Sequence, residues 1–495
     1  MAFKVLFCSL ALLLVSLLRF ATFASCTTSP VTATAEVGKA FKEAEALLNW
    51  KASLDNQNKS LLSSWVGDRP CINWVGITCD DLELGVTRLN LSSFGLKGKM
   101  GNLSTMNLQN NELSGSIPRE IGMMGKLYTL LLLNNNFSGS IPQEVGMMRS
   151  LNQLDLSNNS LIGPIPSSIG NLSELQQLYL YSNSISGSIP EELGFLKHLW
   201  VLQLLDNSLT GPIPASIGKM VELSDLKLSS NNLFGPIPTM IGNLTKLTTL
   251  TLFSNELSGS IPASIGNLTS LSLLNLYENQ ISGPIPTTIG NLTKLITLGL
   301  SDNKLSGSIP ASIGHLAALS ILFVNGNQLS GSIPSTIGNL TMLTNLNLGM
   351  NNLSGSVPVG MNNLTRLTNL QLFDNNFVGQ LPPQICQSGT LVNFTAINNH
   401  FIGPIPKSLK NCSSLVRVRL DGNHLTGNIA EDFDIYPNLN YIDLSSNNLY
   451  GVLSSKWGQC HNLTNLKISN NKISGSIPPE IGNATMLGVL DLSSN

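Results

Sequence analysis

Apolar and polar positions recur along most of the chain with a strict period of 24 residues. Each period contains an L-x-L-x-x-N unit, and its asparagine returns at every step of 24 residues from Asn111 to Asn495. A glycine stands four residues after each of these asparagines from Gly115 to Gly475, and an Ile/Val/Leu-Pro pair usually follows it. Such a repeat predicts a solenoid, because one repeat cannot bury its apolar face alone and stacked neighbours form a continuous core.

Within one repeat, the apolar spacing fits neither a sustained helix nor a plain strand, so each repeat is expected to form one coil. The L-x-L core predicts a short strand, and stacked coils would align these strands into a parallel sheet with neighbours about 4.8 Å apart. The asparagine is expected to turn inward, where its amide can pair with backbone groups at the bend. The glycine allows a tight bend, and the proline fixes an extended conformation after it.

The segments LSGSIPASIGNLTSLSLLNLYEN and LTGPIPASIGKM resemble the plant-specific class of leucine-rich repeat, and the resemblance covers essentially the whole mature chain. In that class the G-x-I-P segment adds a second small sheet. The resemblance implies an α/β repeat solenoid: a right-handed superhelical leucine-rich-repeat array with a parallel concave sheet and a helical N-terminal cap.

Residues 1–24 read as a secretory signal peptide. Lys4 supplies a positive charge, Val5 to Leu18 form an apolar run, and small residues around Ala21 and Ala24 suit a cleavage site. The apolar run is shorter than the roughly 18 to 20 residues needed to cross a bilayer. A short N-terminal segment, residues 25–43, follows.

Residues 44–85 resemble the N-terminal cap of plant receptor kinases. Apolar residues at helical spacing from Glu45 to Leu54 are followed by SSWVGDRPCINWVGITC. The resemblance implies a cap that covers the open core of the first coil and is held by a Cys71–Cys79 disulfide. The leucine-rich repeats then occupy residues 86–495.

A closer resemblance begins at Phe394 and includes VRVRLDGNHLTGNIAEDFDIYPNLNYIDLSSNNLYGVLSSKWGQC. The run is similar to subfamily XII of the plant receptor-like kinases, the group that includes the male-discoverer-interacting receptor kinases. Its two coils without proline, at Ala430 and Ser454, are part of that resemblance. The resemblance implies a single-pass receptor with a cytoplasmic Ser/Thr kinase that senses small peptides in development or plant immunity.

Both ends of the repeat array depart from the pattern. Phe94 stands in place of the first asparagine, 17 residues before Asn111, which a shortened loop or an error in the gene model would each explain. The chain stops at Asn495 in mid-coil, without the C-terminal cap, membrane helix or kinase motifs of such a receptor. We therefore expect the repeats to be C-terminally truncated, with membrane attachment only through a missing C-terminal anchor.

Composition and motifs argue against catalysis and against several classes of partner. With 27 basic and 29 acidic residues, the chain lacks the single-sign field that nucleic acid or an anionic membrane would attract. The five histidines are scattered over the repeats, and no G-x-S-x-G motif accompanies them. No C-x-x-C pair with a nearby histidine completes a zinc set. We expect no enzymatic activity, no cofactor and no metal.

Side chains six, four, two and one positions before each repeat asparagine should face outward on the concave sheet, because side chains alternate along a strand. Aromatic or large apolar residues occupy several of these positions, with acidic residues beside them. The candidate ligand-binding residues of this kind are Tyr179, Tyr181, Leu205, Asp206, Phe253, Tyr277, Glu278, Asp302, Phe323, Phe373 and Asp374. They predict a groove for an extended peptide. The alternative is that the aromatic rings merely pack against strand neighbours.

Two further candidate ligand-binding residues are Arg417 and Arg419, which share one strand. This R-x-R resembles the element by which related peptide receptors hold the free carboxylate of a ligand, and guanidinium groups suit bidentate carboxylate binding. Arg419 is expected to be occupied largely by a cross-strand ladder that begins with Asp443. Arg417 has no acid in its own column, so it should be free or stacked on Tyr441.

Sequons for N-glycosylation recur twelve residues after the repeat asparagine, in a column that should lie on the convex side. They begin at Asn171, Asn243, Asn267, Asn291, Asn339, Asn363, Asn411 and Asn483. The N-L-T sequence is also simply part of the repeat consensus, and both explanations can hold.

Two cysteines fall on adjacent coils at nearly the same place. Cys386 and Cys412 lie 11 and 13 residues after their repeat asparagines, which predicts a disulfide. Two buried free thiols are the alternative. Cys460 has no evident mate and should be free.

The sequence therefore predicts the extracellular, peptide-sensing ectodomain of a plant receptor kinase, exposed on the outer face of the plasma membrane. A peptide or protein ligand and a short leucine-rich-repeat co-receptor kinase would be its partners. One alternative is a secreted inhibitor of cell-wall-degrading enzymes, resembling the polygalacturonase inhibitors, which are usually shorter. The other is a receptor-like protein without a kinase.

Overall fold

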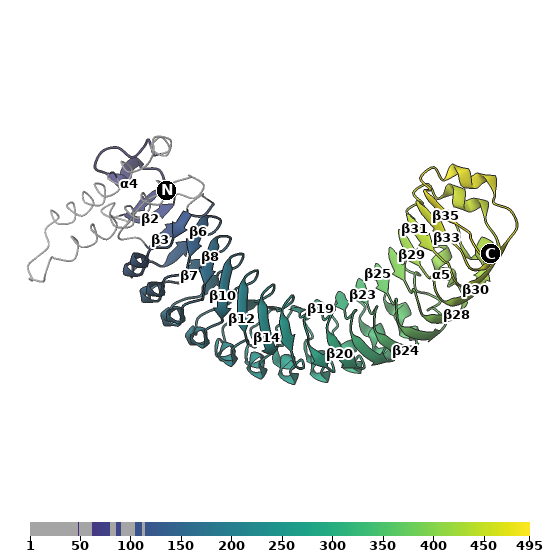
Figure 1. The fold of residues 1–495 in the computed structure, drawn as a ribbon, viewed down its shortest axis with the longest axis horizontal. Coiled ribbons are helices and arrows are strands. Elements are labelled where there is room, and N and C mark those ends of the chain that lie inside the picture. The colour runs from purple at the N-terminus through teal and green to yellow at the C-terminus, as the bar shows by residue number, and fades with distance from the viewer. Residues whose placement is uncertain (1–47, 49–61, 80–85, 91–103, 111–113) are drawn as a thin grey trace, which may run out of the picture. The chain divides into compact units, whose positions relative to one another are not determined.

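The computed structural model describes residues 48, 62–79, 86–90, 104–110 and 114–495 (Figure 1). The predicted signal peptide, residues 25–43 and all of the predicted cap helix except Leu48 lie outside these ranges. The chain divides into two compact units, Met1–Phe234 and Gly235–Asn495, and each is described by itself.

The described part of the cap is built around two tryptophans. Trp65 and Trp74 stack with their ring centroids 5.1 Å apart, and their indole N–H groups donate to the carbonyls of Val75 and Val66. The cap elements are α4 (Pro70–Asn73) and β1 (Ile77–Cys79), and β1 pairs antiparallel with β2 (Val86–Asn90). Cys71 is disulfide-bonded, whereas the side chain of Cys79 lies outside the description, so their pairing stays a prediction.

A parallel sheet of three-residue strands lines the inner side of each unit (Figure 1). After β2, the first unit contributes β3 (Thr105–Asn107), β5 (Thr129–Leu131), β7 (Gln153–Asp155), β9 (Gln177–Tyr179), β11 (Val201–Gln203) and β13 (Asp225–Lys227). The second unit contributes β15 (Thr249–Thr251), β17 (Leu273–Asn275), β19 (Thr297–Gly299), β21 (Ile321–Phe323), β23 (Asn345–Asn347), β25 (Asn369–Gln371), β27 (Asn393–Thr395), β29 (Arg417–Arg419), β31 (Tyr441–Asp443), β33 (Asn465–Lys467) and β35 (Val489–Asp491). These parallel strands form the predicted leucine-rich-repeat solenoid.

The register of the strands follows the sequence period. Gln177, for example, lies beside Gln153, one full repeat earlier. Between the first two coils the step is shorter, because Arg88 lies beside Thr105, 17 residues later. The short first repeat therefore still places its strand in register with the next one.

A second set of parallel strands follows the repeat asparagines, as expected for the G-x-I-P segment. In the first unit these are β4 (Ser114–Ser116), β6 (Asn136–Gly139), β8 (Ser160–Gly163), β10 (Ser184–Ser188) and β12 (Ser208–Gly211), while β14 (Asn232–Pro236) spans the unit boundary. In the second unit they are β16 (Glu256–Ser258), β18 (Ser282–Gly283), β20 (Lys304–Gly307), β22 (Gln328–Gly331), β24 (Asn352–Ser356), β26 (Asn376–Gly379), β28 (His400–Pro404), β30 (His424–Asn428), β32 (Asn448–Val452) and β34 (Lys472–Ser474). The repeated glycine ends many of these strands with a positive φ, such as +76° at Gly163.

Short helices complete the coils on the side away from the inner sheet, and most are single turns of 3-10 helix that begin after the proline. They are η1 (Arg119–Met123), η2 (Gln143–Met147), η3 (Ser167–Asn171), η4 (Glu191–Phe195), η5 (Ala215–Lys219), η6 (Thr239–Asn243), η7 (Ala263–Asn267), η8 (Thr287–Asn291), η9 (Ala311–His315), η10 (Ser335–Asn339), η11 (Val359–Asn363), α5 (Lys407–Lys410), α6 (Ile429–Asp432), η12 (Ser455–Gln459) and η13 (Pro479–Asn483).

The two coils without proline cap their helices with side chains instead. Asn428 accepts a hydrogen bond from the backbone N–H of Ala430 over 3.1 Å, and Ser454 accepts one from Lys456 over 3.3 Å. Ala430 stands where other coils have proline, so its N–H is a donor that proline would lack, and Asn428 accepts from it. Ser454 itself takes the place of the proline and caps its helix through the N–H of Lys456. Each of these coils therefore caps its helix with a local polar side chain.

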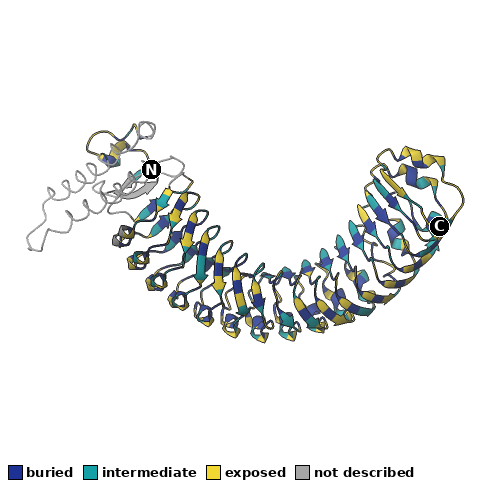
Figure 2. Cartoon of the chain, in the orientation of Figure 1, coloured by how far each residue is buried: buried dark blue, intermediate teal, exposed yellow. Residues whose placement is uncertain are grey.

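The core consists of the repeat leucines and isoleucines, most of which are fully buried (Figure 2). The repeat asparagine turns inward, as predicted. Asn159 donates to the carbonyls of Leu132, Leu156 and Ser157 over 3.0 to 3.1 Å and accepts from the N–H of Phe137 over 3.0 Å. One amide thus satisfies backbone groups in its own coil and in the preceding one.

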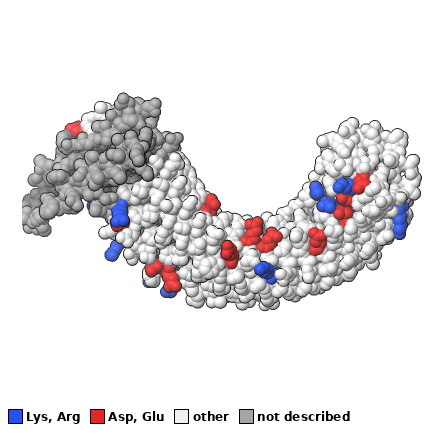
Figure 3. Space-filling model, in the orientation of Figure 1, with Lys and Arg blue, Asp and Glu red and all other residues white. Residues whose placement is uncertain are grey.

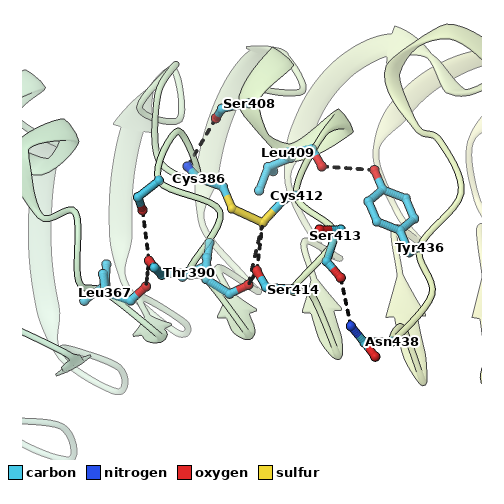
Figure 4. Close-up of a disulfide and its surroundings, with 12 residues drawn as sticks. Leu367, Cys386, Thr390, Ser408, Leu409, Cys412, Ser413, Ser414, Tyr436 and Asn438 are labelled. Atoms are coloured by element: carbon cyan, nitrogen blue, oxygen red, sulfur yellow. Dashed lines mark hydrogen bonds between the residues drawn. A yellow bond between two sulfur atoms is a disulfide. The ribbon is translucent and has the colours of Figure 1, made fainter.

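The cysteines that the sequence places on adjacent coils are bonded to each other. Cys386 and Cys412 form a disulfide with their Cα atoms 5.9 Å apart (Figure 4). Nearby, the Tyr436 hydroxyl donates to the carbonyl of Leu409 over 3.1 Å. Cys460 is free and buried.

Candidate ligand-binding face

We define the sheet face of a unit as the side chains six, four, two and one positions before its repeat asparagines. In most strands of the inner sheet the middle residue is buried and its neighbours remain at least partly exposed (Figure 2). All thirteen candidate ligand-binding residues lie on the sheet face and are exposed or half-buried. Those from Tyr179 to Asp206 belong to the first unit, and those from Phe253 to Arg419 belong to the second.

In the first unit, two tyrosines form an edge-to-face pair. The ring centroids of Tyr179 and Tyr181 lie 6.5 Å apart with an interplanar angle of 84°, and the Tyr179 hydroxyl donates to Gln177 over 3.1 Å. Burial, followed by the negative charges of Asp155 and Asp225, raises the pKa of Tyr179. Tyr179 therefore stays a neutral hydrogen-bonding ring across the physiological range.

In the second unit, Phe253 and Tyr277 stack almost in parallel, with centroids 4.4 Å apart and an interplanar angle of 10°. The edge of Tyr277 leans over Gly299, because a Cβ added there would lie 3.4 Å from a ring carbon. The ring of Phe373 covers Gly349 in the same way. These rings therefore do pack against neighbouring coils, which was the alternative left open by the sequence. Part of the surface of each ring nevertheless remains exposed.

The acidic candidates stand one position before the repeat asparagine, where the backbone is left-handed. The φ angles of Asp206, Glu278, Asp302 and Asp374 lie between 50° and 56°. Asn398 donates to Asp374 over 2.7 Å, and the Ser254 hydroxyl bonds to Glu278. Partial burial, followed by the charge of Glu278, raises the pKa of Asp302. Within the described ranges, no ion pair involves any of these four acids.

The two arginines differ in their surroundings. The Arg417 guanidinium lies over the ring of Tyr441, with its central carbon 4.1 Å from the ring centroid. No hydrogen bond or ion pair joins its side chain to any other residue that the structure describes. Arg419 and Lys467 lie 5.9 Å and 5.8 Å from the same centroid. Three cations therefore surround one aromatic ring.

The expected partner of Arg419 requires a correction. Arg419 binds Asp421, with nitrogen–oxygen distances of 3.0 and 3.3 Å, rather than Asp443 on the next strand. Asp443 instead accepts from the N–H of Ser445 over 3.1 Å and from the Tyr441 hydroxyl over 3.3 Å. Asp421, two residues after Arg419, presents both of its carboxylate oxygens to the guanidinium. Asp443 is buried and already accepts hydrogen bonds from Ser445 and Tyr441.

Sequence reasoning missed an amide ladder that leads up to Arg417. Asn393 donates to Asn369 over 2.6 Å, Asn369 to Asn345 over 2.5 Å, and Asn345 to the Thr344 hydroxyl over 2.9 Å. Asn393 is in register with Arg417 on the neighbouring strand. Asparagine at the same position in three successive repeats was the signal available in the sequence.

Other chemistry is not evident in the part of the chain that the structure describes. No group of three His, Cys, Asp or Glu side chains in those ranges could hold a metal ion. His400 and His424 stack on the second sheet with centroids 6.1 Å apart. None of the helices in the described ranges is long and apolar enough to cross a membrane.

The chain matches three family models, all of leucine-rich-repeat type. The "Leucine-rich repeat region" model matches residues 167–281 and 263–381, and "Leucine Rich Repeat" matches 102–124, 150–172 and 462–484. The "Leucine rich repeat N-terminal domain" model matches residues 42–80, which cover most of the cap predicted at 44–85.

The curated and solved proteins that this chain resembles include receptor kinases of Arabidopsis. MDIS1-interacting receptor like kinase 2 of Arabidopsis thaliana is 44% identical over 94 residues, which are 16% of this chain and 9% of that protein. The chain spans only 8% to 9% of the length of such curated relatives in these alignments. The ectodomain of the Arabidopsis receptor kinase HAESA, solved with the peptide hormone IDA and the co-receptor SERK1, is 32% identical with a TM-score of 0.61, covering 91% of this chain and 89% of that chain.

A further HAESA ectodomain structure, in complex with an N-terminally extended IDA peptide, has a TM-score of 0.78. Its identity to this chain is 36%, over 92% of this chain and 78% of that one. Identity and coverage of this extent show that the chain belongs to the family of leucine-rich-repeat ectodomains of plant receptor kinases.

Proposed function

We propose that this chain is the extracellular, peptide-sensing ectodomain of a plant cell-surface receptor kinase. An extended peptide binds along the sheet face of the second unit, and Arg417 binds its terminal carboxylate. The observation that carries this proposal is that the guanidinium of Arg417 has no acidic partner in the part of the chain that the structure describes. This guanidinium is exposed on the sheet face, lies over the ring of Tyr441 with its central carbon 4.1 Å from the centroid, and has no carboxylate partner among the described residues.

Stacking on Tyr441 prepares Arg417 for a carboxylate. A cation–π contact uses the face of the guanidinium and leaves its N–H edge free to donate. That edge presents two parallel donors, which match the two oxygens of a carboxylate. Arg419 already donates to Asp421, so it contributes positive charge rather than a free pair of donors.

The aromatic residues of the second unit supply the apolar contacts. Phe253 and Tyr277 stack on each other, Tyr277 and Phe373 also lean over neighbouring glycines, and Phe323 is 38% exposed. Rigid, partly exposed aromatic side chains are the residues that most often dominate binding energy at interfaces. A peptide that crosses the strands would bury them in succession.

The relatives support the partners in this proposal. The HAESA structures contain the peptide hormone IDA, and one of them also contains the co-receptor SERK1. By analogy, a short leucine-rich-repeat co-receptor kinase would join this ectodomain once a peptide is bound. The likeness to MDIS1-interacting receptor like kinase 2 favours membership of subfamily XII, a cytoplasmic Ser/Thr kinase, and a place on the outer face of the plasma membrane.

Eight glycans would decorate the opposite side of the repeats. All eight sequon asparagines in the predicted column are exposed, and they lie at the ends of the short helices, away from the inner sheet. Glycans placed there would leave the sheet face open to a peptide.

Affinity selection with the secreted ectodomain tests the proposal. The probe is a synthetic library of random decapeptides, half with a free C-terminal acid and half amidated, and bound peptides are identified by mass spectrometry. We expect free acids to be enriched by at least about tenfold, and Arg417→Ala to remove that enrichment. Equal recovery of acids and amides by the native protein would refute carboxylate recognition.

A further inference from the structure

On the sheet face of the second unit, the strands from β15 to β27 carry only acidic charge, and basic residues appear only from β29 onward. From β15 to β27, the only charged residues on this face are Glu278, Asp302 and Asp374. Basic residues appear first at β29, with Arg417 and Arg419, and this end of the face also carries Asp421, which binds Arg419, and Asp443. Figure 3 shows basic atoms near the far end of the inner side, with acidic atoms beside them. A ligand complementary to this face carries a positive charge before its negative one.

Glu278 and Asp302 form the acidic end of this arrangement. They occupy the same position in adjacent coils, on the turns that follow β17 and β19, and both have a φ of 53°. The charge of Glu278 contributes to the raised pKa of Asp302, so the two carboxylates repel each other, and no cation among the described residues neutralises them. A cation supplied by a ligand would relieve this repulsion.

Tyr277 completes the acidic end with an aromatic ring. It directly precedes Glu278, and the Glu278 charge contributes to the raised pKa of its hydroxyl, after burial. The ring is held between Phe253, on which it stacks, and Gly299, over which its edge leans. An aromatic face beside two carboxylates is the combination that binds a guanidinium or an ammonium group.

We propose that Tyr277, Glu278 and Asp302 bind a basic side chain of the peptide, which rests on the proposed peptide-binding function of this face. The occupant is an arginine or lysine of the same extended peptide whose terminal carboxylate binds Arg417. The ligand class is thereby narrowed to peptides with a basic residue at a set distance from a free C-terminus.

The sheet sets that distance. Five strand-to-strand steps separate β19, the strand of Asp302, from β29, the strand of Arg417, and every intervening pair is in parallel register. At about 4.8 Å per step the strands alone span about 24 Å, and the position of Asp302, further along its coil than that of Arg417, lengthens the path. An extended peptide advances about 3.3 Å per residue, so the basic residue lies at least about seven residues before the C-terminal one.

The decapeptide selection described above, read by position, tests this inference. We expect Arg and Lys to be enriched at least about threefold, about seven to nine residues before a free C-terminus, relative to the other positions. The double variant Glu278→Gln/Asp302→Asn should lose this preference and still select free acids over amides. Both substitutions keep the size and hydrogen-bonding shape of the native side chain, so the fold is retained.

Two further variants sharpen the result. Asp374, like Glu278 and Asp302, stands one position before its repeat asparagine, but its strand β25 lies only two strand-to-strand steps from β29. Asp374→Asn should therefore leave the positional preference for Arg and Lys unchanged. Asp302→Lys should reverse the preference, so that Asp or Glu is enriched at the same distance. Reversal cannot arise from a loss of folding.

The outcomes separate this inference from the proposed function. Free acids selected through Arg417, without any positional preference for Arg or Lys, would overturn the inference and leave the proposed function in place. A preference for basic residues that survives in the Glu278→Gln/Asp302→Asn variant, or that ignores the distance to the C-terminus, would also overturn it. Equal selection of acids and amides, or no selection of peptides, would overturn both.

Discussion

The side-chain amide of Asn279 donates a hydrogen bond to the backbone carbonyl of Leu252, which lies in the preceding coil, over 3.0 Å. The same amide donates to Leu276 and Tyr277, and its oxygen accepts from the N–H of Leu257. A single side chain therefore satisfies four backbone groups at the turn where the inner strand ends. It thereby ties two coils together and adds to the backbone hydrogen bonds at the turn.

Replacing this asparagine should destabilise the solenoid strongly. Asn279→Ala leaves several buried backbone groups unpaired, so we expect the free energy of unfolding to fall by about 2 to 4 kcal/mol. Gln280→Ala, at the exposed neighbouring position, should change it by less than about 0.5 kcal/mol. Chemical denaturation of the two purified variants measures both values. Similar effects of the two substitutions would contradict the role assigned to the asparagine.

A second prediction concerns the close stacking of the 3-10 helices. A Cβ added at Gly266 would lie 2.5 Å from the carbonyl oxygen of Thr288 in the next coil. Gly266→Ala should therefore push two coils apart and cost about 1 to 3 kcal/mol of stability. Gly125, just after η1, is exposed, and a Cβ added there would meet nothing within 4 Å. Thermal melting should show a clear loss for Gly266→Ala and almost none for Gly125→Ala.

The third prediction concerns the cysteines. The Cys386–Cys412 bridge closes a loop of 26 residues, which corresponds to about 3 kcal/mol in the chain-entropy description. The double variant Cys386→Ala/Cys412→Ala should lose about that much stability. Burial raises the pKa of the Cys460 thiol, so alkylation of the folded protein should leave it unmodified. Peptide mapping without reduction that finds Cys386 alkylated, or Cys460 readily alkylated, would contradict this assignment.

The sequence could predict those features that repeat in every coil. The period of 24 residues places the strands, the inward leucines, the asparagine turn and the second sheet, because each depends on local chemistry that every coil shares. Even the left-handed turn residue has a signature, since Asn, Asp, Ser and Gly predominate one position before the repeat asparagine.

The sequence could not predict which of several possible partners a given side chain bonds to. Arg419 could reach an acid along its own strand or across to the next, and only the geometry selects Asp421 over Asp443. The helix caps at Asn428 and Ser454 likewise appear only once the missing proline is placed at a helix start. The number of strands between Asp302 and Arg417 likewise translates into a distance only once their parallel register is known.

The fourth prediction concerns glycans. Peptide mapping of protein secreted from plant cells should find most of the eight sequons from Asn171 to Asn483 occupied, because all of them are exposed. The sequon at Asn393 should be bare, since Asn393 is half-buried on the sheet face and donates to Asn369 over 2.6 Å. A largely bare convex column would refute the first expectation. High occupancy at Asn393 would place a glycan beside Arg417 and block the proposed carboxylate site.

The last prediction separates the two arginines. Arg417 has free donors and Arg419 is committed to Asp421, so only the first should control recognition of a free C-terminus. For the most enriched peptide of the selection, Arg417→Ala should weaken binding of the free acid by about 2 kcal/mol or more and leave the amidated form nearly unaffected. Arg419→Ala should change the two forms alike, because it removes a neighbouring charge and exposes Asp421 to both. Calorimetric titration of each variant with both peptides gives the four differences. If Arg417→Ala weakens binding of the acid and of the amide equally, Arg417 has only a structural role on Tyr441. If Arg419→Ala selectively weakens binding of the acid, Arg419 is the residue that binds the carboxylate.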